Sequence, residues 1–145
     1  MSAVRTCHDP PITMTKVIVN GTFDILHKGH LKMLEYARSL GDQVLVCIDS
    51  DSRVKELKGT SRPINNQYDR AFMLASLRYV DMVWTFDSDE NLIKQIKLYD
   101  PAIMVKGSDW KDKPIVGEEF CGRIEFFERI HGYSTTETIQ HITDR

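Results

Sequence analysis

Several features that mark other protein classes are missing from this sequence of 145 residues. No apolar run reaches the roughly 20 residues that a transmembrane helix needs, and residues 1–15 lack the apolar stretch of a secretory signal peptide. We therefore expect a soluble, cytoplasmic protein without a membrane partner. The three cysteines are widely scattered and form no C-x-x-C pair, which excludes a disulfide framework and fits thiols in a reducing compartment.

An excess of charge of one sign is also missing. The net charge of −2, from 19 Lys+Arg against 21 Asp+Glu, gives no general attraction to nucleic acid, so no such partner is expected. Any site for anions must therefore be local. A hydrophobic content of 41% in a chain of this length supports one packed core. Residues 1–15 contain Pro10-Pro11 and no periodicity, so we expect a flexible N-terminal arm before a single domain over residues 16–145.

Strand patterns and helix patterns alternate along the rest of the chain. Short apolar runs predict strands at residues 16–20, 43–48, 82–86, 103–106 and 123–127. Helical spacing predicts helices at residues 31–40 and at about 67–77, 91–99 and 135–142. This alternation predicts a doubly wound, Rossmann-like α/β fold, with a parallel sheet of about five strands and helices on both faces. Ligands of such sheets bind beyond the carboxyl ends of the strands.

The segment after the first strand has the features of a phosphate cradle. Gly21 permits a tight loop that brings main-chain N–H groups close to an anion. The next helix opens near Gly29, so its positive end points to the same place. His27 and His30, three residues apart, can together hold a transferring phosphate. Two other interpretations are an ordinary helix start and a metal site with Asp24, for which zinc would need further ligands.

A basic segment follows the second strand, and it contains Arg53, Lys55, Lys58 and Arg62. Such a run can be a solvated surface. Because it follows a strand end and is broken by glycine and proline, a mobile basic loop that closes over phosphates is the other interpretation. Arg70 stands in the first turn of the next predicted helix, where the dipole disfavours a cation, and a nearby acceptor phosphate would explain it.

Two further segments contain candidate binding residues. Lys106-Gly107-Ser108-Asp109-Trp110 ends the fourth strand and is either a surface turn or a nucleoside pocket, with the aspartate accepting from sugar or base. Near the C-terminus, Ser134 and Glu137 form a capping-box pattern. That pattern leaves Arg129, Thr135 and Thr136 unexplained, and hydroxyls at a helix N-terminus beside an arginine suggest a second polyphosphate site.

These motifs together resemble a known family. Gly21-Thr22-Phe23-Asp24 followed by His27-x-Gly29-His30 is similar to the first signature of the HxGH nucleotidyltransferases, and Arg129-x-x-Gly132-x-Ser134-Thr135-Thr136 is similar to their second. The resemblance extends over about residues 16–142. It implies transfer of a nucleoside monophosphate from a nucleoside triphosphate to a sugar or polyol phosphate, with release of pyrophosphate. Mg²⁺ would accompany the nucleotide, and the family's tendency to dimerise leaves a homodimer open.

Two branches of that family remain candidates. The segments Lys58-Gly59-x-Ser61-Arg62-Pro63 and Val105-Lys106-Gly107-Ser108-Asp109-Trp110, with Ile115-Val116-Gly117 following, look like the adenylyltransferase domain that converts ATP and D-glycero-β-D-manno-heptose 1-phosphate to ADP-heptose for lipopolysaccharide cores. Arg78-Tyr79-Val80-Asp81 looks more like glycerol-3-phosphate cytidylyltransferase, which uses CTP to make CDP-glycerol. We prefer the first branch, although Ser108 replaces its usual second glycine. A catalytically silent nucleotide-binding module is a third hypothesis.

The resemblance also implies roles for individual residues. The catalytic candidates are His27, His30, Lys58 and Arg129. The nucleotide-binding candidates are Gly21, Thr22, Phe23, Asp24, Gly29, Lys106, Gly107, Asp109, Trp110, Ser134, Thr135 and Thr136. Asp51 and Arg70 are the acceptor-binding candidates, and no protein side chains are expected to form a metal site.

Overall fold

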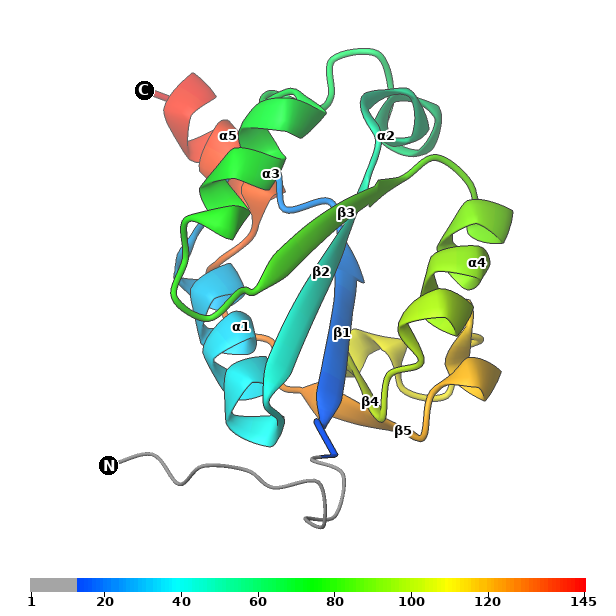
Figure 1. The fold of residues 1–145 in the computed structure, drawn as a ribbon. Coiled ribbons are helices and arrows are strands. Elements are labelled where there is room, and N and C mark those ends of the chain that lie inside the picture. The colour runs from blue at the N-terminus through cyan, green and yellow to red at the C-terminus, as the bar shows by residue number, and fades with distance from the viewer. Residues whose placement is uncertain (1–12) are drawn as a thin grey trace, which may run out of the picture.

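Five parallel strands form one sheet in the computed structural model, which describes residues 13–145 (Figure 1). The strands are β1 (Lys16–Gly21), β2 (Gln43–Asp49), β3 (Met82–Phe86), β4 (Ile103–Gly107) and β5 (Arg123–Phe127). Their order in the sheet is β3-β2-β1-β4-β5, so β1 lies in the middle. Most of the N-terminal arm expected over residues 1–15 lies outside the described residues.

Helices cover both faces of this sheet. They are α1 (Lys28–Leu40), α2 (Asp51–Lys58), α3 (Gln67–Ala75), α4 (Asp89–Tyr99) and α5 (Thr135–Thr143), with short 3₁₀ turns at Ser108–Trp110 and Glu118–Phe120. Leu34 of α1 and Leu74 of α3 pack into the core on one face, whereas Ile96 of α4 packs on the other. The prediction of a doubly wound parallel sheet with about five strands is therefore confirmed.

The central strand shows why this sequence needs two covered faces. Val17 and Val19 of β1 point into the core that α1 and α3 cover, and Ile18 points into the core on the α4 face. All three side chains have 0% exposure. Side chains alternate between the faces of a strand, so a continuous apolar run is stable only where both faces are buried.

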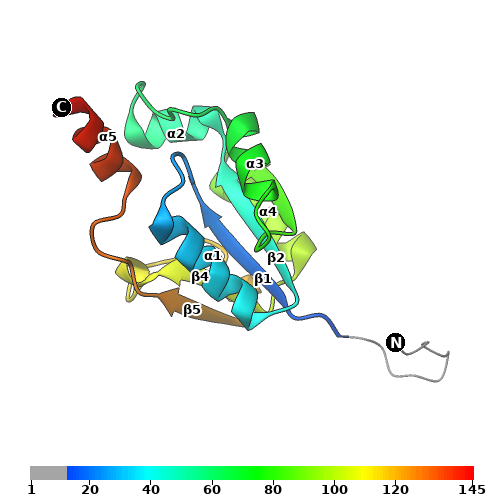
Figure 2. The ribbon, with the colours of Figure 1, turned by 90° about the vertical axis from the view of Figure 1, so that its left-hand side faces the viewer.

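The chain changes direction across the sheet between β1 and β4. It moves outward from β1 through β2 to β3, and then crosses back to add β4 and β5 on the opposite side of β1. The loops that follow β1 and β4 therefore run to opposite sides of the sheet. The space between these loops leaves room for a ligand. In Figure 2, α2 and α5 lie beyond this end of the sheet. None of the helices in the described range 13–145 is long and apolar enough to span a membrane.

One of the two interpretations of the basic segment was wrong for its first part. Instead of a mobile loop, this part forms the helix α2 (Asp51–Lys58). The hydroxyl of Ser50 caps it by accepting from the N–H of Arg53, and the helix ends at Gly59 with φ of 97°. Only one side chain of this helix, Val54, is buried, and most of the others are charged. The sequence of α2 therefore shows no clear amphipathic pattern.

Candidate active site

A pocket of about 310 Å³ lies at the carboxyl ends of the strands, at the change of direction between β1 and β4. It brings together segments that are more than a hundred positions apart in the chain. The sequence-predicted residues that line it are His27, Gly29, His30, Lys58, Lys106, Gly107, Asp109, Trp110, Arg129, Ser134, Thr135 and Thr136.

The two histidines form a capping box at the start of α1. His27 is the N-cap residue, and its Nδ1 accepts from the N–H of His30 at 3.4 Å, while Nδ1 of His30 accepts from the N–H of His27 at 3.3 Å. The rings stack with their centroids 3.8 Å apart and an interplanar angle of 19°. Because both Nδ1 atoms accept hydrogen bonds, each neutral ring carries its proton on Nε2. The histidines can therefore donate hydrogen bonds without being protonated further.

The surroundings keep both histidines neutral. Burial, followed by repulsion from His27, Lys58 and Arg129, lowers the pKa of His30 to about 3, although Asp24 acts in the opposite direction. Burial also lowers the pKa of His27, and Arg129 adds to this shift. At neutral pH the pair therefore offers N–H dipoles rather than a positive charge.

Positive charge in the pocket comes from other side chains. Lys58, Arg62, Lys106 and Arg129 line it, and Asp109 is the one carboxylate among the described lining residues. The pKa of Lys58 is lowered by partial desolvation and then by the nearby Arg62 guanidinium. Burial lowers the pKa of Lys106, whose Nζ lies 4.4 Å from the centroid of the Trp110 ring. Cations that lose solvent and repel one another favour an anionic ligand.

The start of α5 closes another side of the pocket. Ser134 is the N-cap residue, and its Oγ accepts from the N–H of Glu137 at 3.0 Å, as the capping pattern predicts. Thr135 and Thr136 follow in the first turn, where free N–H groups and the helix dipole favour an anion. The geometry brings this helix end into the same pocket as the histidine pair.

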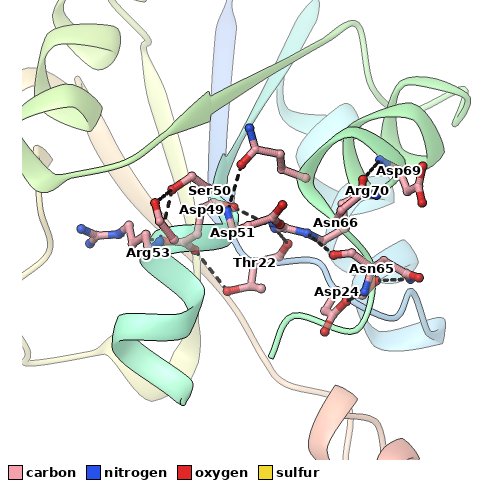
Figure 3. Close-up of polar contacts among 12 residues, drawn as sticks. Thr22, Asp24, Asp49, Ser50, Asp51, Arg53, Asn65, Asn66, Asp69 and Arg70 are labelled. Atoms are coloured by element: carbon pink, nitrogen blue, oxygen red, sulfur yellow. Dashed lines mark hydrogen bonds and ion pairs between the residues drawn. The ribbon is translucent and has the colours of Figure 1, made fainter. Parts of the chain in front are cut away.

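Arg70 occupies a different place from the one expected. It is only 1% exposed and does not line the pocket. Its Nε donates to the carbonyl of Asn65 at 2.9 Å, and its Nη1 donates to the carbonyls of Thr22 at 2.9 Å and Asp49 at 2.8 Å. Its Nη2 donates to Oδ1 of Asp51 at 2.9 Å (Figure 3). These bonds explain the arginine without a phosphate, and they correct the expectation that Arg70 contacts the acceptor.

Asp24 and Asp51, two other candidates, also serve the structure. The carboxylate of Asp24 is 1% exposed and accepts from the N–H groups of Ile64 at 2.7 Å and Asn65 at 2.8 Å. Asp51 pairs with the buried Arg70. Figure 3 shows this network joining the loop after β1 to the loop before α3. Neither carboxylate lines the pocket, so we withdraw the assignment of Asp24 to the nucleoside and of Asp51 to the acceptor.

Gly21, Thr22 and Phe23 connect β1 to the histidine pair without lining the pocket. Phe23 is 3% exposed, adopts φ of 50° and packs in the core. A Cβ on Gly21 would lie 3.1 Å from the Phe23 ring, so a larger residue there would disturb this packing. The hydroxyl of Thr22 donates to Oδ2 of Asp49 at 3.1 Å, which fixes the loop. A role for the N–H groups of these residues stays a prediction.

Sequence reasoning missed part of the pocket wall. The lining residues that no motif named are Asn20, Met33, Phe127, Ile130 and Tyr133; Arg62 and Val105, which lie in the segments that resemble the heptose branch but had no assigned role of their own, also line the pocket. Asn20 is the last residue but one of the central strand β1, and its Oδ1 is buried without a hydrogen-bond partner among residues 13–145. The sequence signal for Asn20 was its place directly after an apolar run, at the carboxyl end of the predicted first strand. The apolar members belong to core strands and helices, so their patterns alone point only to packing.

Side chains that could form a metal site are not grouped in the described part of the chain. No cluster of three or more His, Cys, Asp or Glu residues has a suitable arrangement there. Asp24 precedes His27 by three residues, just as His27 precedes His30. Its carboxylate nevertheless accepts from the backbone N–H groups of residues 64 and 65.

Comparison with known proteins agrees with the fold. The family model described as cytidylyltransferase-like matches residues 18–140. The chain is 48% identical over 128 residues to the bifunctional protein HldE of Aliarcobacter butzleri (strain RM4018), a match that covers 88% of this chain and 27% of that protein. It is 46% identical over 129 residues to HldE of Campylobacter jejuni (strain RM1221), with 89% and 28% covered. The chain thus spans little more than a quarter of the length of these relatives.

A solved structure has a similar fold. The crystal structure of the lipopolysaccharide core biosynthesis protein from Thermoplasma volcanium GSS1 superimposes with a TM-score of 0.64 and 26% sequence identity. The match covers 84% of this chain and 100% of the other. With the family model matching most of the chain, and a histidine pair, cations and a helix N-terminus in one pocket, the chain belongs to the cytidylyltransferase-like family of nucleotidyltransferases.

Proposed function

We propose that this protein transfers AMP from ATP to D-glycero-β-D-manno-heptose 1-phosphate, giving ADP-heptose and pyrophosphate. The single observation that carries the reaction type is the pocket, in which the stacked His27 and His30 face Lys58 and Arg129. The heptose acceptor is supported by the sequence segments shared with the heptose branch. The likeness to part of the HldE proteins and to a lipopolysaccharide core biosynthesis protein adds to this support.

The reaction needs alignment and charge stabilisation rather than a strong base. The acceptor phosphate is already ionised near neutral pH, so one of its oxygens can attack the α-phosphorus directly. The bond between the α-phosphorus and the bridging oxygen breaks, and its electron pair leaves with pyrophosphate. The Nε2–H groups of His27 and His30 would donate to the phosphate oxygens on which charge accumulates. Neutral donors fit this role at pH 7, since neither histidine needs to gain or lose a proton.

The remaining pocket residues divide between the two ends of the nucleotide. Arg129 and the start of α5, with Ser134, Thr135 and Thr136, would hold the β- and γ-phosphates. Asp109 and Trp110, beside Lys106 and Gly107, would contact the nucleoside. A side chain on Gly107 would clash with Oδ1 of Asp109 at 2.5 Å, so this position keeps the aspartate in place.

Mg²⁺ would enter with the nucleotide. The described pocket wall offers one carboxylate, Asp109, among nitrogen donors, whereas Mg²⁺ prefers several oxygen ligands. These side chains do not fit a metal ion held by the protein alone, so the ion would be held by the phosphate oxygens. A cytoplasmic location and a homodimer also stay predictions.

A substrate matrix tests the proposal. ATP and CTP are each combined with heptose 1-phosphate and with glycerol 3-phosphate, and pyrophosphate release is measured. We expect the highest kcat/KM for ATP with heptose 1-phosphate. A preference for CTP with glycerol 3-phosphate would replace this assignment by the cytidylyltransferase alternative. Nucleotide binding without pyrophosphate release from any pair would instead indicate a silent binding module.

A further inference from the structure

Arg62 is a largely buried cation whose Nε makes no hydrogen bond within residues 13–145. It lines the pocket with a side chain that is 13% exposed. The carboxylate of Asp24 lies 3.7 Å away from Nε, but both oxygens of Asp24 already accept backbone N–H groups. A largely buried guanidinium with one long ion pair and an Nε that makes no hydrogen bond is costly unless a ligand accepts its donors.

The loop that carries Arg62 is held firmly in place. Asp24 accepts from the N–H groups of Ile64 and Asn65, just beyond the arginine. Arg70 donates to the carbonyl of Asn65 from the other side, and it also binds the carbonyl of Thr22 (Figure 3). Two buried charges thus fasten this loop to the loop after β1. The guanidinium of Arg62 is therefore directed into the pocket by a fixed backbone rather than by a mobile surface segment.

The cations of the pocket lie on two sides of the histidine pair. The ring of His27 lies 6.2 Å, centroid to centroid, from the ring of Tyr133 in the C-terminal segment, and Arg129 of the same segment lowers the pKa of His27. On the other side, Nε of Arg62 lies 3.7 Å from the carboxylate of Asp24 in the loop after β1, and Arg62 is the largest charge effect on the pKa of Lys58. The pocket therefore has an Arg129 side and a Lys58–Arg62 side, with the two histidines between them.

The two sides of the pocket suit different substrates. In phosphoryl and nucleotidyl transfer the attacking and leaving oxygens are roughly in line on opposite sides of the phosphorus. If pyrophosphate leaves on the side of Arg129 and α5, the acceptor must enter from the side of Lys58 and Arg62. A guanidinium can bind two phosphate oxygens at once, and a lysine supplies a point charge.

We propose that Arg62 binds the phosphate of the acceptor beside Lys58, and so selects phosphorylated acceptors and points their oxygen at the α-phosphorus. This inference rests on the proposed function and gives to Arg62 the role that the sequence suggested for Arg70. Arg62 contacts the substrate, whereas Arg70 and Asp24 are positioning residues that hold its loop.

Steady-state kinetics of two variants test the proposal. Arg62→Gln removes the charge, and Arg62→Lys keeps the charge but loses the two-pronged geometry. Lys55→Gln is the matched control, because Lys55 belongs to the same basic segment, is exposed and does not line the pocket. We expect Arg62→Gln to raise the KM for heptose 1-phosphate by about 10- to 100-fold and the KM for ATP by less than about 3-fold. Arg62→Lys should give a smaller increase, and the control should match the wild type.

A binding measurement separates this inference from the proposed function. Heptose 1-phosphate and unphosphorylated heptose are titrated calorimetrically into wild type and Arg62→Gln, each saturated with a non-hydrolysable ATP analogue. The wild type should prefer the phosphorylated sugar, and the variant should lose that preference while its melting temperature stays within a few degrees. Loss of the preference would support Arg62 even if the wild type released no pyrophosphate, a result that would overturn only the proposed function. An unchanged acceptor affinity, no wild-type binding of the phosphorylated sugar, or a larger effect on ATP would overturn the role of Arg62.

Discussion

His27 and His30 each combine a structural role with a role in the pocket. Their Nδ1 atoms satisfy two N–H groups at the start of α1, and their Nε2–H groups remain for a phosphate. The first role fixes the tautomer that the second role needs. The spacing of three residues is thus explained twice, by the geometry of a capping box and by the convergence of two donors on one ligand.

Replacement of His30 by alanine should affect activity far more than folding. Loss of one donor at developing negative charge typically lowers kcat by ~10²- to 10³-fold. The lost cap bonds should lower the free energy of unfolding by about 1 kcal/mol. Pyrophosphate release and urea denaturation measure the two effects. A turnover number close to that of the wild type would refute the assignment of His30.

Stability should decrease in mild acid because of the same histidines. The pKa of His30 is lowered to about 3 in the folded protein, against about 6.5 in the unfolded chain, and the pKa of His27 is also lowered. Below pH 6.5 the unfolded state therefore binds protons that the folded state does not, so the free energy of unfolding falls as the pH falls. The slope is at most about 1.4 kcal/mol per pH unit for each histidine.

Urea denaturation between pH 7.5 and pH 4.5 measures this effect, with His30→Gln as the comparison. The glutamine can still accept the backbone N–H but does not titrate, so its pH dependence should be weaker. Identical slopes for the two proteins would show that His30 is not the group responsible.

Arg70 should be a stability determinant that activity assays register only indirectly. Its replacement by lysine would leave two or more of the carbonyls of Asn65, Thr22 and Asp49 without their donors. We expect a loss of about 2–4 kcal/mol in the free energy of unfolding. The midpoint of urea denaturation checks this value, and Arg78→Lys, at an exposed arginine, is the control. A loss no larger than that of the control would contradict the central role of Arg70.

At the scale of elements, α5 differs from the other helices. It carries pocket residues at its start, yet none of its side chains is buried. Figure 2 shows it beyond the edge of the layers that α1 and α3 form. A helix with few buried apolar contacts opens at low free energy. Its position should therefore depend on the ligand that its N-terminus binds.

Hydrogen exchange tests this dependence. Without nucleotide, amides of α5 should exchange much faster than those of β1, which lies in the centre of the sheet. Addition of ATP with Mg²⁺ should slow exchange in residues 129–138 more than in α4, which is remote from the pocket. Equal protection of both segments would argue against binding of the triphosphate by the start of α5.

Most elements could be predicted because their patterns are local. The strands β3 and β5 occupy the ranges that their apolar runs indicate, and the helix ends fall within a few residues of the expected positions. The helix α2 could not be predicted, since a helix of eight residues with Val54 as its one buried side chain shows no clear period. The positions of Arg62 and Arg70 could not be predicted either. Which arginine is buried depends on carbonyls and carboxylates that only the fold brings together.

At the scale of the whole molecule, the distribution of charge matters more than its sum. The net charge is −2, but the described pocket wall holds four cations, Lys58, Arg62, Lys106 and Arg129, and one carboxylate. The small net charge indicated that any site for anions must be local. The fold brings the four cations together from α2, the following loop, β4 and the C-terminal segment. Long-range attraction of the triphosphate is therefore confined to one end of the sheet.

Salt should weaken substrate binding without unfolding the protein. Raising NaCl from about 0.05 M to about 0.5 M shortens the screening length from about 14 Å to about 4 Å, so the KM for ATP should rise several-fold. The melting temperature, which depends mainly on the two buried cores, should change little. A KM that does not respond to salt would contradict an electrostatic origin of nucleotide binding.

The central position of β1 determines the order in which the chain can be assembled during synthesis. Lys16 of β1 pairs with Gln43 of β2, which follows soon after, but Val17 of β1 pairs with Ile103 of β4. One edge of this apolar strand therefore stays open until β4 has left the ribosome. Open strand edges recruit other chains, so we expect aggregation to compete with folding in this interval. Arg129 is made later still, so the pocket can be completed only after β5 has been synthesised.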